Sequence, residues 1–323
     1  MKYNYIYTGD KNWSEFFFSD LFNLKNFKYF SDEYEAYKTP FWKLVYKINY
    51  SPVTNRFIHH PLQHLFNSHL YRHKFDDDKP VCMIFQGDRW RWFNDESFIR
   101  HLRCRYKGCK LVLYMIDLVQ TYPAIDVEYV NRVFDAVITY DKGQAEKYGW
   151  LYFPTPYSRM DLKPESSCEK SDIYFCGFTK NRYRDILDVY DACEGQGLDC
   201  LFYVRNSSGV KMEPRAGIKE DVKLSYRENV CHVINSKCNL EVMQKNAVGY
   251  TPRLWEAIIY DRHLLTDNYS IKDSPYYYPQ GIHFIDEDLS NIAQIIKTPV
   301  KYPQSIKDSL SPVRFLEIIE SVL

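Results

Sequence analysis

The chain has 323 residues, more than the roughly 100 to 200 residues of an average domain, so we expect two domains of about 150 residues each. Its 42 Lys and Arg residues balance its 42 Asp and Glu residues, and a formal net charge of zero excludes the basic proteins that bind nucleic acid through their charge. The N-terminus lacks the features of a signal peptide, and no window approaches about 18 uninterrupted apolar residues. We therefore expect a cytoplasmic protein with no nucleic-acid partner and no membrane span.

Aromatic residues are abundant, with 29 Tyr and 20 Phe, and many stand among Lys and Asn near the N-terminus. They could form a surface in peripheral contact with the inner face of the membrane, or they could reflect only a Tyr-rich composition.

The nine cysteines have irregular spacings and no Cys-x-x-Cys pair. Several lie in apolar runs that are typical of core strands, namely Cys82, Cys176, Cys200 and Cys238. We therefore expect reduced, buried thiols.

In the first half of the chain, short apolar runs alternate with helical patterns, which is typical of βαβ units and a parallel sheet. The expected strands are "YNYIYTG", residues 80–88, 110–117 and 134–141, and, after the short helix "KGQAEKYG", the run "WLYFPTPYS". The clear strands end in polar residues: Gln86 with Asp88, then Asp117, then Asp141. Because ligands bind at the carboxyl ends of parallel strands, these polar groups are expected beside a cleft.

The second half restarts the same pattern after a polar segment. Expected elements are a strand at 172–178, a helix at about 182–196, a strand at 200–205, the helix "YRENVCHVINS", a strand at 238–244, the helix of "TPRLWEAIIY", and the strands "HLLTDN" and "IHFID". We predict an α/β protein with two Rossmann-like, doubly wound domains facing a cleft. The domains span residues 1–157 and 172–300, joined by a linker at 158–171 and followed by an amphipathic helical tail at 301–323 that could pack on the first domain.

The run "FCGFTKNRYRDIL" places a glycine after a strand and two cations at the start of a helix. Gly177, Lys180 and Arg182 could thus hold a phosphate at the free N–H groups of the helix N-terminus. The run does not match a dinucleotide or P-loop motif, so the two cations could equally be solvated loop residues.

A charged pair opens a second helix, in "GYTPRLWEAIIYDRHLLTDN". Arg253 and Glu256 are three residues apart and share a helix face, where a carboxylate could accept ribose hydroxyls and the guanidinium could bind phosphate. The simpler alternative is a local salt bridge at a capped helix start, with Thr251 as N-cap and Pro252 at the first position.

These motifs resemble the C-terminal domain of small bacterial GT-B glycosyltransferases of capsule and lipopolysaccharide biosynthesis. The resemblance covers about residues 134–290 and rests on Gly249, Thr251, Arg253, Glu256, Ala257, Thr266 and Asn268. It implies a hexosyltransferase that moves a sugar from a nucleotide-sugar donor to a glycan or lipid-linked acceptor, without a cofactor. It also implies that Glu256 holds the donor ribose, and that Arg253 with Lys180 or Arg182 holds the diphosphate. Many relatives carry a second acid eight residues before this glutamate, where this chain has Val248, so an inverting mechanism is preferred.

An inverting transfer needs a general base, which the resemblance places in the N-terminal domain. The candidates are Asp88 and Asp117, with His59 or His60 as weaker ones. Asp88 could instead cap the following helix. Trp90 and Trp92 behind it could stack on a sugar.

Other functions receive less support from the sequence. His60 with His64, and His69 with His73, have the spacing of a metal pair but lack further ligands, and Asp76–Asp78 precede a strand, so we predict no metal site. A dinucleotide-dependent oxidoreductase needs a glycine fingerprint that both halves lack. A catalytically silent nucleotide-binding protein of the same fold stays open.

Overall fold

A computed structural model describes residues 1–30, 39–49, 51–58, 62, 74–89, 96–122, 125–160, 162, 168–207, 209–211, 213–245 and 249–323. The chain forms two compact units, Met1–Ser158 with Pro312–Leu323, and Arg159–Ser311. The candidates His59, His60, His64, His69, His73, Trp90, Trp92 and Val248 lie outside the described residues.

The described part of the first unit contains a six-stranded sheet in the order β2-β1-β3-β4-β5-β6, and every neighbouring pair is parallel. Its strands are β1 (Asn4–Thr8), β2 (Phe27–Phe30), β3 (Val81–Gln86), β4 (Lys110–Met115), β5 (Ala136–Thr139) and β6 (Leu151–Tyr152). The strand β2 lies on one side of β1, and β3 to β6 follow one another on the other side. The switch point of this unit therefore lies at the carboxyl ends of β1 and β3.

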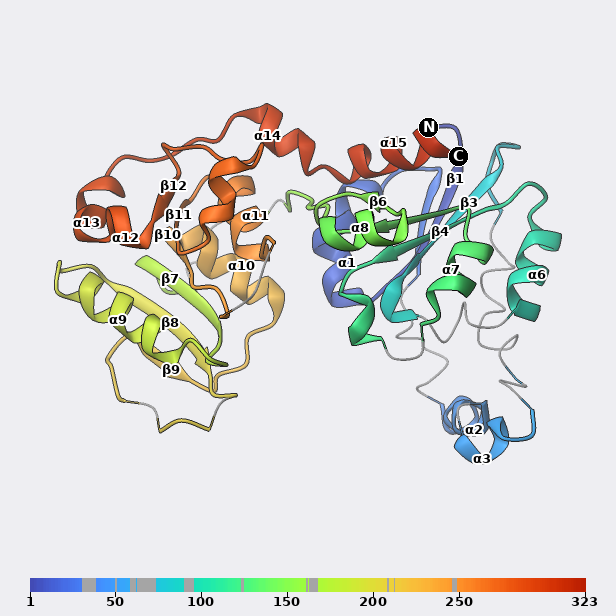
Figure 1. Cartoon of the computed structure of the whole chain (residues 1–323), viewed down its shortest axis with the longest axis horizontal. Helices are drawn as coiled ribbons and strands as arrows, with labels where there is room; N and C mark the ends of the chain where they lie inside the picture. The colour runs from blue at the N-terminus through green and yellow to red at the C-terminus, as the bar shows by residue number, and fades with distance from the viewer. Residues whose placement is uncertain are drawn as a thin grey trace. The chain divides into compact units, whose positions relative to one another are not determined.

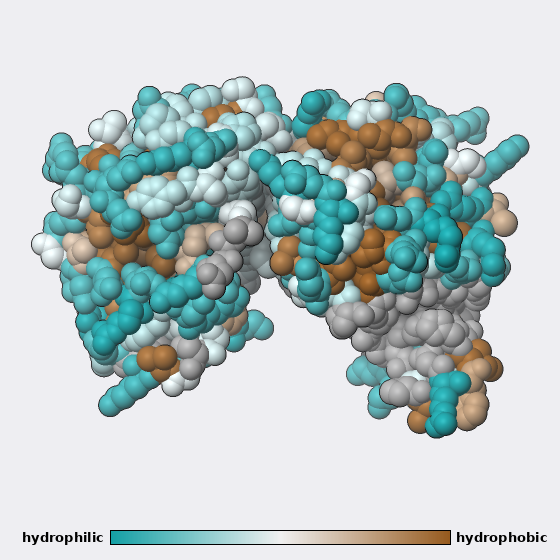
Figure 2. Space-filling model, viewed as in Figure 1, coloured by the Kyte–Doolittle hydropathy of each residue, from teal (hydrophilic) through white to brown (hydrophobic). Residues whose placement is uncertain are grey.

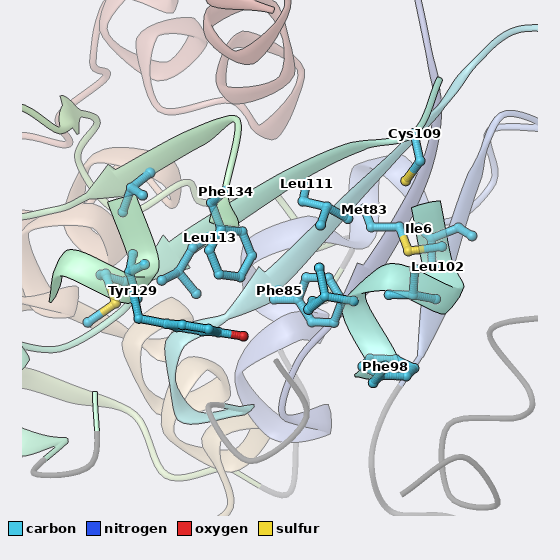
Figure 3. Close-up of a cluster of buried hydrophobic side chains, with 14 of the residues drawn as sticks. Ile6, Met83, Phe85, Phe98, Leu102, Cys109, Leu111, Leu113, Tyr129 and Phe134 are labelled. Atoms are coloured by element: carbon cyan, nitrogen blue, oxygen red, sulfur yellow. The ribbon is translucent and has the colours of Figure 1, made fainter. Parts of the chain in front are cut away.

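Helices cover both faces of this sheet (Figure 1). They are α1 (Lys11–Phe18), α6 (Glu96–Arg105), α7 (Val127–Val133), α8 (Lys142–Tyr148) and α15 (Pro312–Val322), with α2 (Pro40–Asn49) and α3 (Pro52–Asn55) in a separate segment. The helices α6 and α7 pack on one face through Phe98, Leu102 and Tyr129, which meet Phe85 and Leu113 of the strands (Figure 3). Because both faces are covered, the middle residues of β3 and β4 are a continuous apolar run rather than an alternating pattern.

The C-terminal helix α15 belongs to this first unit, although the second unit precedes it in the chain. Phe315 packs against Phe18, Tyr114 and Phe153 with ring centroids 5.0 to 5.5 Å apart. Tyr5 donates a hydrogen bond of 2.8 Å to Glu320 Oε1. Within the described ranges, no helix combines the length and the apolarity that crossing a bilayer requires.

The second unit contains a parallel sheet in the order β12-β11-β10-β7-β8-β9. Its strands are β7 (Ser171–Phe178), β8 (Cys200–Arg205), β9 (Ile218–Glu220), β10 (Ser236–Glu241), β11 (His263–Thr266) and β12 (Ile282–Phe284). Numbered within the unit this is 6-5-4-1-2-3, the doubly wound order. The switch point therefore lies between β7 and β10.

The helices of this unit are α9 (Tyr183–Glu194), α10 (Tyr226–Asn235), α11 (Pro252–Ile259), α12 (Ile285–Asp288), α13 (Ile292–Ile295) and α14 (Gln304–Ser309). On one face, Ile186 and Val189 of α9 and Ile292 of α13 join Phe175 and Phe202 of the strands in one buried cluster. The predicted α/β class with doubly wound domains is confirmed in each unit.

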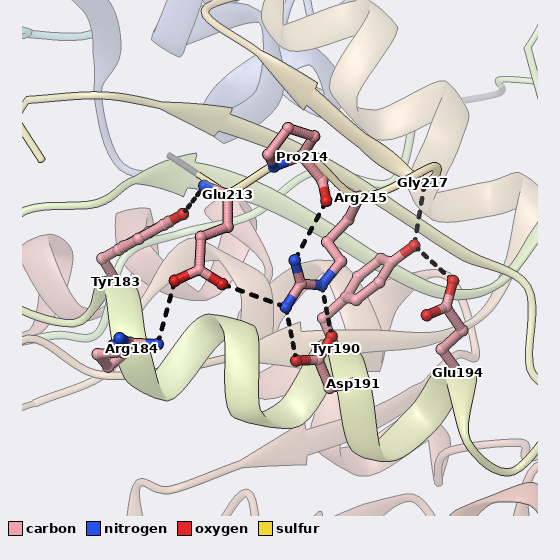
Figure 4. Close-up of polar contacts among 9 residues, drawn as sticks. All are labelled: Tyr183, Arg184, Tyr190, Asp191, Glu194, Glu213, Pro214, Arg215 and Gly217. Carbon is pink, nitrogen blue, oxygen red and sulfur yellow. Dashed lines mark hydrogen bonds and ion pairs between the residues drawn. The ribbon is translucent and has the colours of Figure 1, made fainter. Parts of the chain in front are cut away.

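Polar contacts attach the segment just before the edge strand β9 to α9 (Figure 4). Arg215 binds Asp191 through two bonds of 2.7 and 2.9 Å. Glu213 donates its backbone N–H to Tyr183 Oη at 2.6 Å, and Gly217 donates its N–H to Tyr190 Oη at 2.9 Å. Side chains of α9 therefore hold the segment before β9 in place. The helix α9 was predicted from the sequence, whereas the strand β9 was not.

The expectation that every cysteine is reduced is wrong for one pair. Cys168 and Cys231 form a disulfide, with Cα atoms 6.4 Å apart. Cys168 stands just before β7 and Cys231 lies on α10, so 63 residues separate them in sequence. Their proximity comes from the packing of α10 beside β7, which no Cys spacing reveals.

Candidate functional site

The candidate site lies at the switch point of the second unit. Gly177 is near the carboxyl end of β7, Glu241 ends β10, and the helices α9 and α11 begin on the segments that follow these two strands. Helix N-termini carry free N–H groups and partial positive charge, so this edge of the sheet favours anions. The predicted residues Arg182 and Arg253 both reach it.

Two arginines from different helices converge on Gly177. Arg182 donates its Nε–H to the carbonyl of Phe178 at 3.2 Å and its Nη1–H to the carbonyl of Val242. Arg253 donates from Nη2 to the carbonyl of Cys176. Both guanidinium groups also lie over the ring of Phe175, at 5.8 and 5.0 Å from its centroid.

Glycine at position 177 lets both guanidinium groups lie against the strand. A Cβ atom there would lie 2.5 Å from Nη2 of Arg253 and 3.3 Å from Nη2 of Arg182. Any larger residue would push the guanidinium groups away from the strand. The glycine that sequence reasoning attributed to a phosphate turn therefore makes room for the cations.

Glu241, Glu256 and Asp267 lie near enough to the two arginines to interact with their charges, but none of the three forms an ion pair with them. In the described part of the chain, neither Arg182 nor Arg253 has a carboxylate within ion-pair distance. Burial, and then the neighbouring charge of Arg253, lower the pKa of Arg182 to about 10, so this side chain stays cationic at neutral pH. Arg182 is buried and held by backbone carbonyls, whereas Arg253 is only half-buried. Arg253 is thus the arginine that an anion could contact.

Glu256 lies one turn into α11 and is 3% exposed. Its Oε1 accepts hydrogen bonds from Tyr226 Oη at 2.7 Å and from Asn229 Nδ2 at 3.0 Å, both on α10. Burial raises the pKa of this carboxyl to about 7. Among the described residues Glu256 forms no ion pair, so it does not form the alternative salt bridge with Arg253. The predicted cap is present, because Thr251 Oγ1 accepts from the N–H of Arg253 at 3.2 Å.

A second buried acid, Glu241, was missed by the sequence analysis. Its Oε1 accepts a hydrogen bond from Thr251 Oγ1, and its Oε2 accepts one of 2.6 Å from Thr266 Oγ1. Burial raises its pKa. Nearby, Asn268 donates from Nδ2 to the carbonyl of Gly249 at 2.9 Å. These bonds join the ends of β10 and β11 to the start of α11, so Glu241 supports the helix that carries Arg253.

Lys180 stands apart from this cluster. Its side chain is exposed, and its φ of 43° lies in the left-handed region. Its backbone N–H donates to Ser207 Oγ at 3.1 Å, and Ser207 donates its own N–H to Thr179 Oγ1 at 3.0 Å. Lys180 is therefore a solvated residue at the rim of the site.

The two candidate bases lie in the first unit, on neighbouring strand ends. Asp88 follows β3 in the short turn Gly87–Arg89, beside the switch point of that unit. Asp117 follows β4, one strand further from the switch point, and its Oδ1 accepts the N–H of Leu118 at 2.8 Å. Position in the sheet therefore favours Asp88.

Comparison with known proteins gives the fold. No protein-family model matches the chain, and no curated protein matches it in sequence. The Anabaena protein Alr3699/HepE, whose crystal structure is in complex with UDP and glucose, is 9% identical with a TM-score of 0.51, over 98% of this chain and 99% of that chain. A UDP-N-acetylglucosamine 2-epimerase from Rickettsia bellii is 12% identical with a TM-score of 0.50, over 99% and 97%. The chain has the GT-B fold. It also matches the Glycosylation Associate Protein (Gap123) complex of Streptococcus agalactiae, with 9% identity and a TM-score of 0.44, where it spans 59% of that protein's length.

Proposed function

We propose that this protein is a glycosyltransferase that moves a hexose from a nucleotide-sugar donor to a glycan or lipid-linked acceptor in capsule or lipopolysaccharide biosynthesis. The observation that supports it most is the unpaired cationic edge at Gly177, flanked by two helix N-termini and by the buried carboxyl of Glu256. Its charges complement a nucleoside diphosphate.

Each side chain has a distinct role in this proposal. Arg253 contacts the diphosphate, and Arg182 adds positive potential from beneath it while holding β7 and the end of β10 together. Glu256 accepts hydrogen bonds from ribose hydroxyls. The departing nucleoside diphosphate gains negative charge as the sugar leaves, so a fixed cation and two helix N-termini stabilise the transition state more than the bound donor. We propose that this replaces a metal ion.

The reaction is an inverting displacement at the anomeric carbon. The acceptor hydroxyl forms a bond to that carbon as the bond to the diphosphate oxygen breaks, and a general base takes the hydroxyl proton. We assign the base to Asp88 rather than Asp117, because Asp88 follows β3 at the switch point of the first unit, whereas Asp117 follows β4, one strand further away.

A transfer assay with matched variants tests this function. The protein is incubated with UDP-glucose and other nucleotide sugars, with and without oligosaccharide acceptors, and release of the nucleoside diphosphate is followed. Asp88→Asn should lower turnover by about 10² to 10⁴ while leaving nucleotide affinity unchanged, and Asp117→Asn should change turnover only a few-fold.

Three outcomes would contradict the proposal. Binding of a nucleotide without any turnover would indicate a catalytically silent protein of this fold. Conversion of the donor sugar to its epimer, without acceptor-dependent release, would indicate an epimerase. Full activity of Asp88→Asn would refute the assignment of the base.

A further inference from the structure

The segment that carries α2 and α3 exposes an unusual set of large apolar side chains. Phe57 is 80% exposed, Val53 71% and Phe41 62%. We call the following set the α2–α3 patch: Phe41, Leu44, Ile48, Val53, Phe57 and Ile58, all of which are exposed. Single exposed apolar residues are ordinary, but six in one short segment indicate a surface that binds something.

The exposed side chains of α2 form one stripe along the helix. Phe41, Leu44 and Ile48 follow the i, i+3, i+7 spacing of a single helix face. The adjacent face turns inward, because Val45 and Asn49 are buried and Asn49 Oδ1 accepts the N–H of Leu62 at 2.8 Å. One face of the helix is therefore buried, and a second, apolar face is exposed.

The segment that carries this apolar stripe also carries basic residues, and it contains no Asp or Glu. Lys43 and Lys47 lie one turn apart on the exposed side of α2, and Arg56 immediately precedes Phe57. The sequence from position 39 to 75 contains five Lys or Arg residues and no Asp or Glu, although the whole chain has a net charge of zero. Figure 2 shows hydrophobic and hydrophilic surface side by side where Figure 1 draws α2 and α3.

We propose that the α2–α3 patch binds the surface of a bilayer that contains anionic lipids. The apolar stripe enters the boundary between headgroups and acyl chains, and Lys43, Lys47 and Arg56 contact lipid phosphates beside it. Long basic side chains suit this geometry, since their stems stay apolar while their charges reach the headgroups. A second copy of the chain would fit poorly, because it would bring the same positive charges face to face. Surface binding of this kind does not depend on the sugar-transfer chemistry.

Vesicle flotation of the full chain tests the proposal. The vesicles are phosphatidylcholine alone, or phosphatidylcholine with phosphatidylglycerol in equal parts. The wild type should float with the anionic vesicles, and more weakly as salt rises. Replacing Lys43, Lys47 and Arg56 together by Gln should lower the affinity for anionic vesicles by about 100-fold, at about fivefold per charge. The matched control replaces Lys25, Arg100 and Lys107, three exposed basic residues elsewhere in the same unit, and should float like the wild type.

The apolar contribution is tested by replacing Phe41, Leu44 and Phe57 by Ser. Because these side chains are exposed, the variant should fold and bind UDP like the wild type, but should no longer float. Two results would overturn the proposal: a wild type that does not float with anionic vesicles at low salt, and a Ser variant that floats unchanged. A wild type that ignores vesicles but dimerises, with the dimer lost in the Ser variant, would assign the patch to a second copy.

Discussion

The buried carboxyl of Glu256 predicts a pH-dependent stability that its replacement by Gln should remove. The folded protein raises the pKa of this group from 4.5 to about 7 because the side chain is buried. Between these two values the folded state holds a proton that the unfolded state has released. Stability therefore falls as pH rises through this window, and below the lower value the group contributes no pH dependence.

The size of the effect follows from the shift. Each pKa unit corresponds to about 1.4 kcal/mol, so ionisation of Glu256 lowers the free energy of unfolding by roughly 3 kcal/mol at pH 8 relative to pH 4. Gln at this position keeps an Oε1 that can accept from Tyr226 and Asn229, and it carries no charge at any pH. Relative to the wild type, Glu256→Gln should therefore gain stability steadily as pH rises.

This difference is measured by unfolding both proteins in urea at several pH values between 4 and 8. Near-ultraviolet circular dichroism reports the unfolding. The control is Glu220→Gln, which changes an exposed glutamate of the same unit. A difference between wild type and Glu256→Gln that stays constant with pH would refute the reasoning. If Glu256 also holds the donor ribose, the stabilised variant should bind nucleoside diphosphate about tenfold more weakly, since it loses a charged acceptor.

Two further substitutions test the packing of the site. Gly177→Ala should weaken UDP binding about tenfold or more by calorimetry, because the new Cβ displaces Arg253. An unchanged affinity would mean that Arg253 does not contact the nucleotide. Thr266→Val should cost about 1 to 3 kcal/mol in urea unfolding, since Oε2 of Glu241 loses its donor. An equal stability of variant and wild type would mean that this hydrogen bond contributes nothing.

The central strands could be predicted from the sequence because both faces of each sheet are covered. Runs such as "VCMIFQ" and "KLVLYM" are apolar except for a polar residue at one end, which is typical of a buried parallel strand. The edge strands β2 and β9 are short and partly polar, "FKYF" and "IKE", so they left no comparable signal. The predicted strand at 238–244 ends earlier, at Glu241, because the chain leaves the sheet where Val242 accepts the hydrogen bond from Arg182.

The start of the helix α11, which carries part of the candidate site, could also be predicted from the sequence. Thr251, Pro252, Arg253 and Glu256 form a helix start whose pattern is contained in six residues. The hydrogen bonds and the burial of these residues could not be predicted, because they involve residues that are distant in the sequence. Glu241 could have been found by applying to the second half the rule that polar residues end buried strands beside a cleft, which was applied only to the first half.

The partners of Glu256 left a weaker signal. Tyr226 and Asn229 have the i, i+3 spacing of one helix face, but nothing in the sequence of α10 points to α11 as the neighbour. The separation of roles between the two arginines is of the same kind. Arg182 donates a hydrogen bond to the backbone carbonyl of Val242, which is 60 residues away in sequence. Any residue type can supply a backbone carbonyl, so this contact could not be predicted from the sequence.

Calorimetric titration of UDP tests most directly whether the carboxyl edge of the second unit binds a nucleoside diphosphate through Arg253. The wild type should bind saturably, and Arg253→Gln should lose at least about tenfold in affinity. The matched variant Arg215→Gln removes a guanidinium from the segment before β9, where it binds Asp191, and should keep wild-type affinity. Equal affinity of wild type and Arg253→Gln, or no binding of UDP, GDP or CDP to the wild type, would contradict the claim.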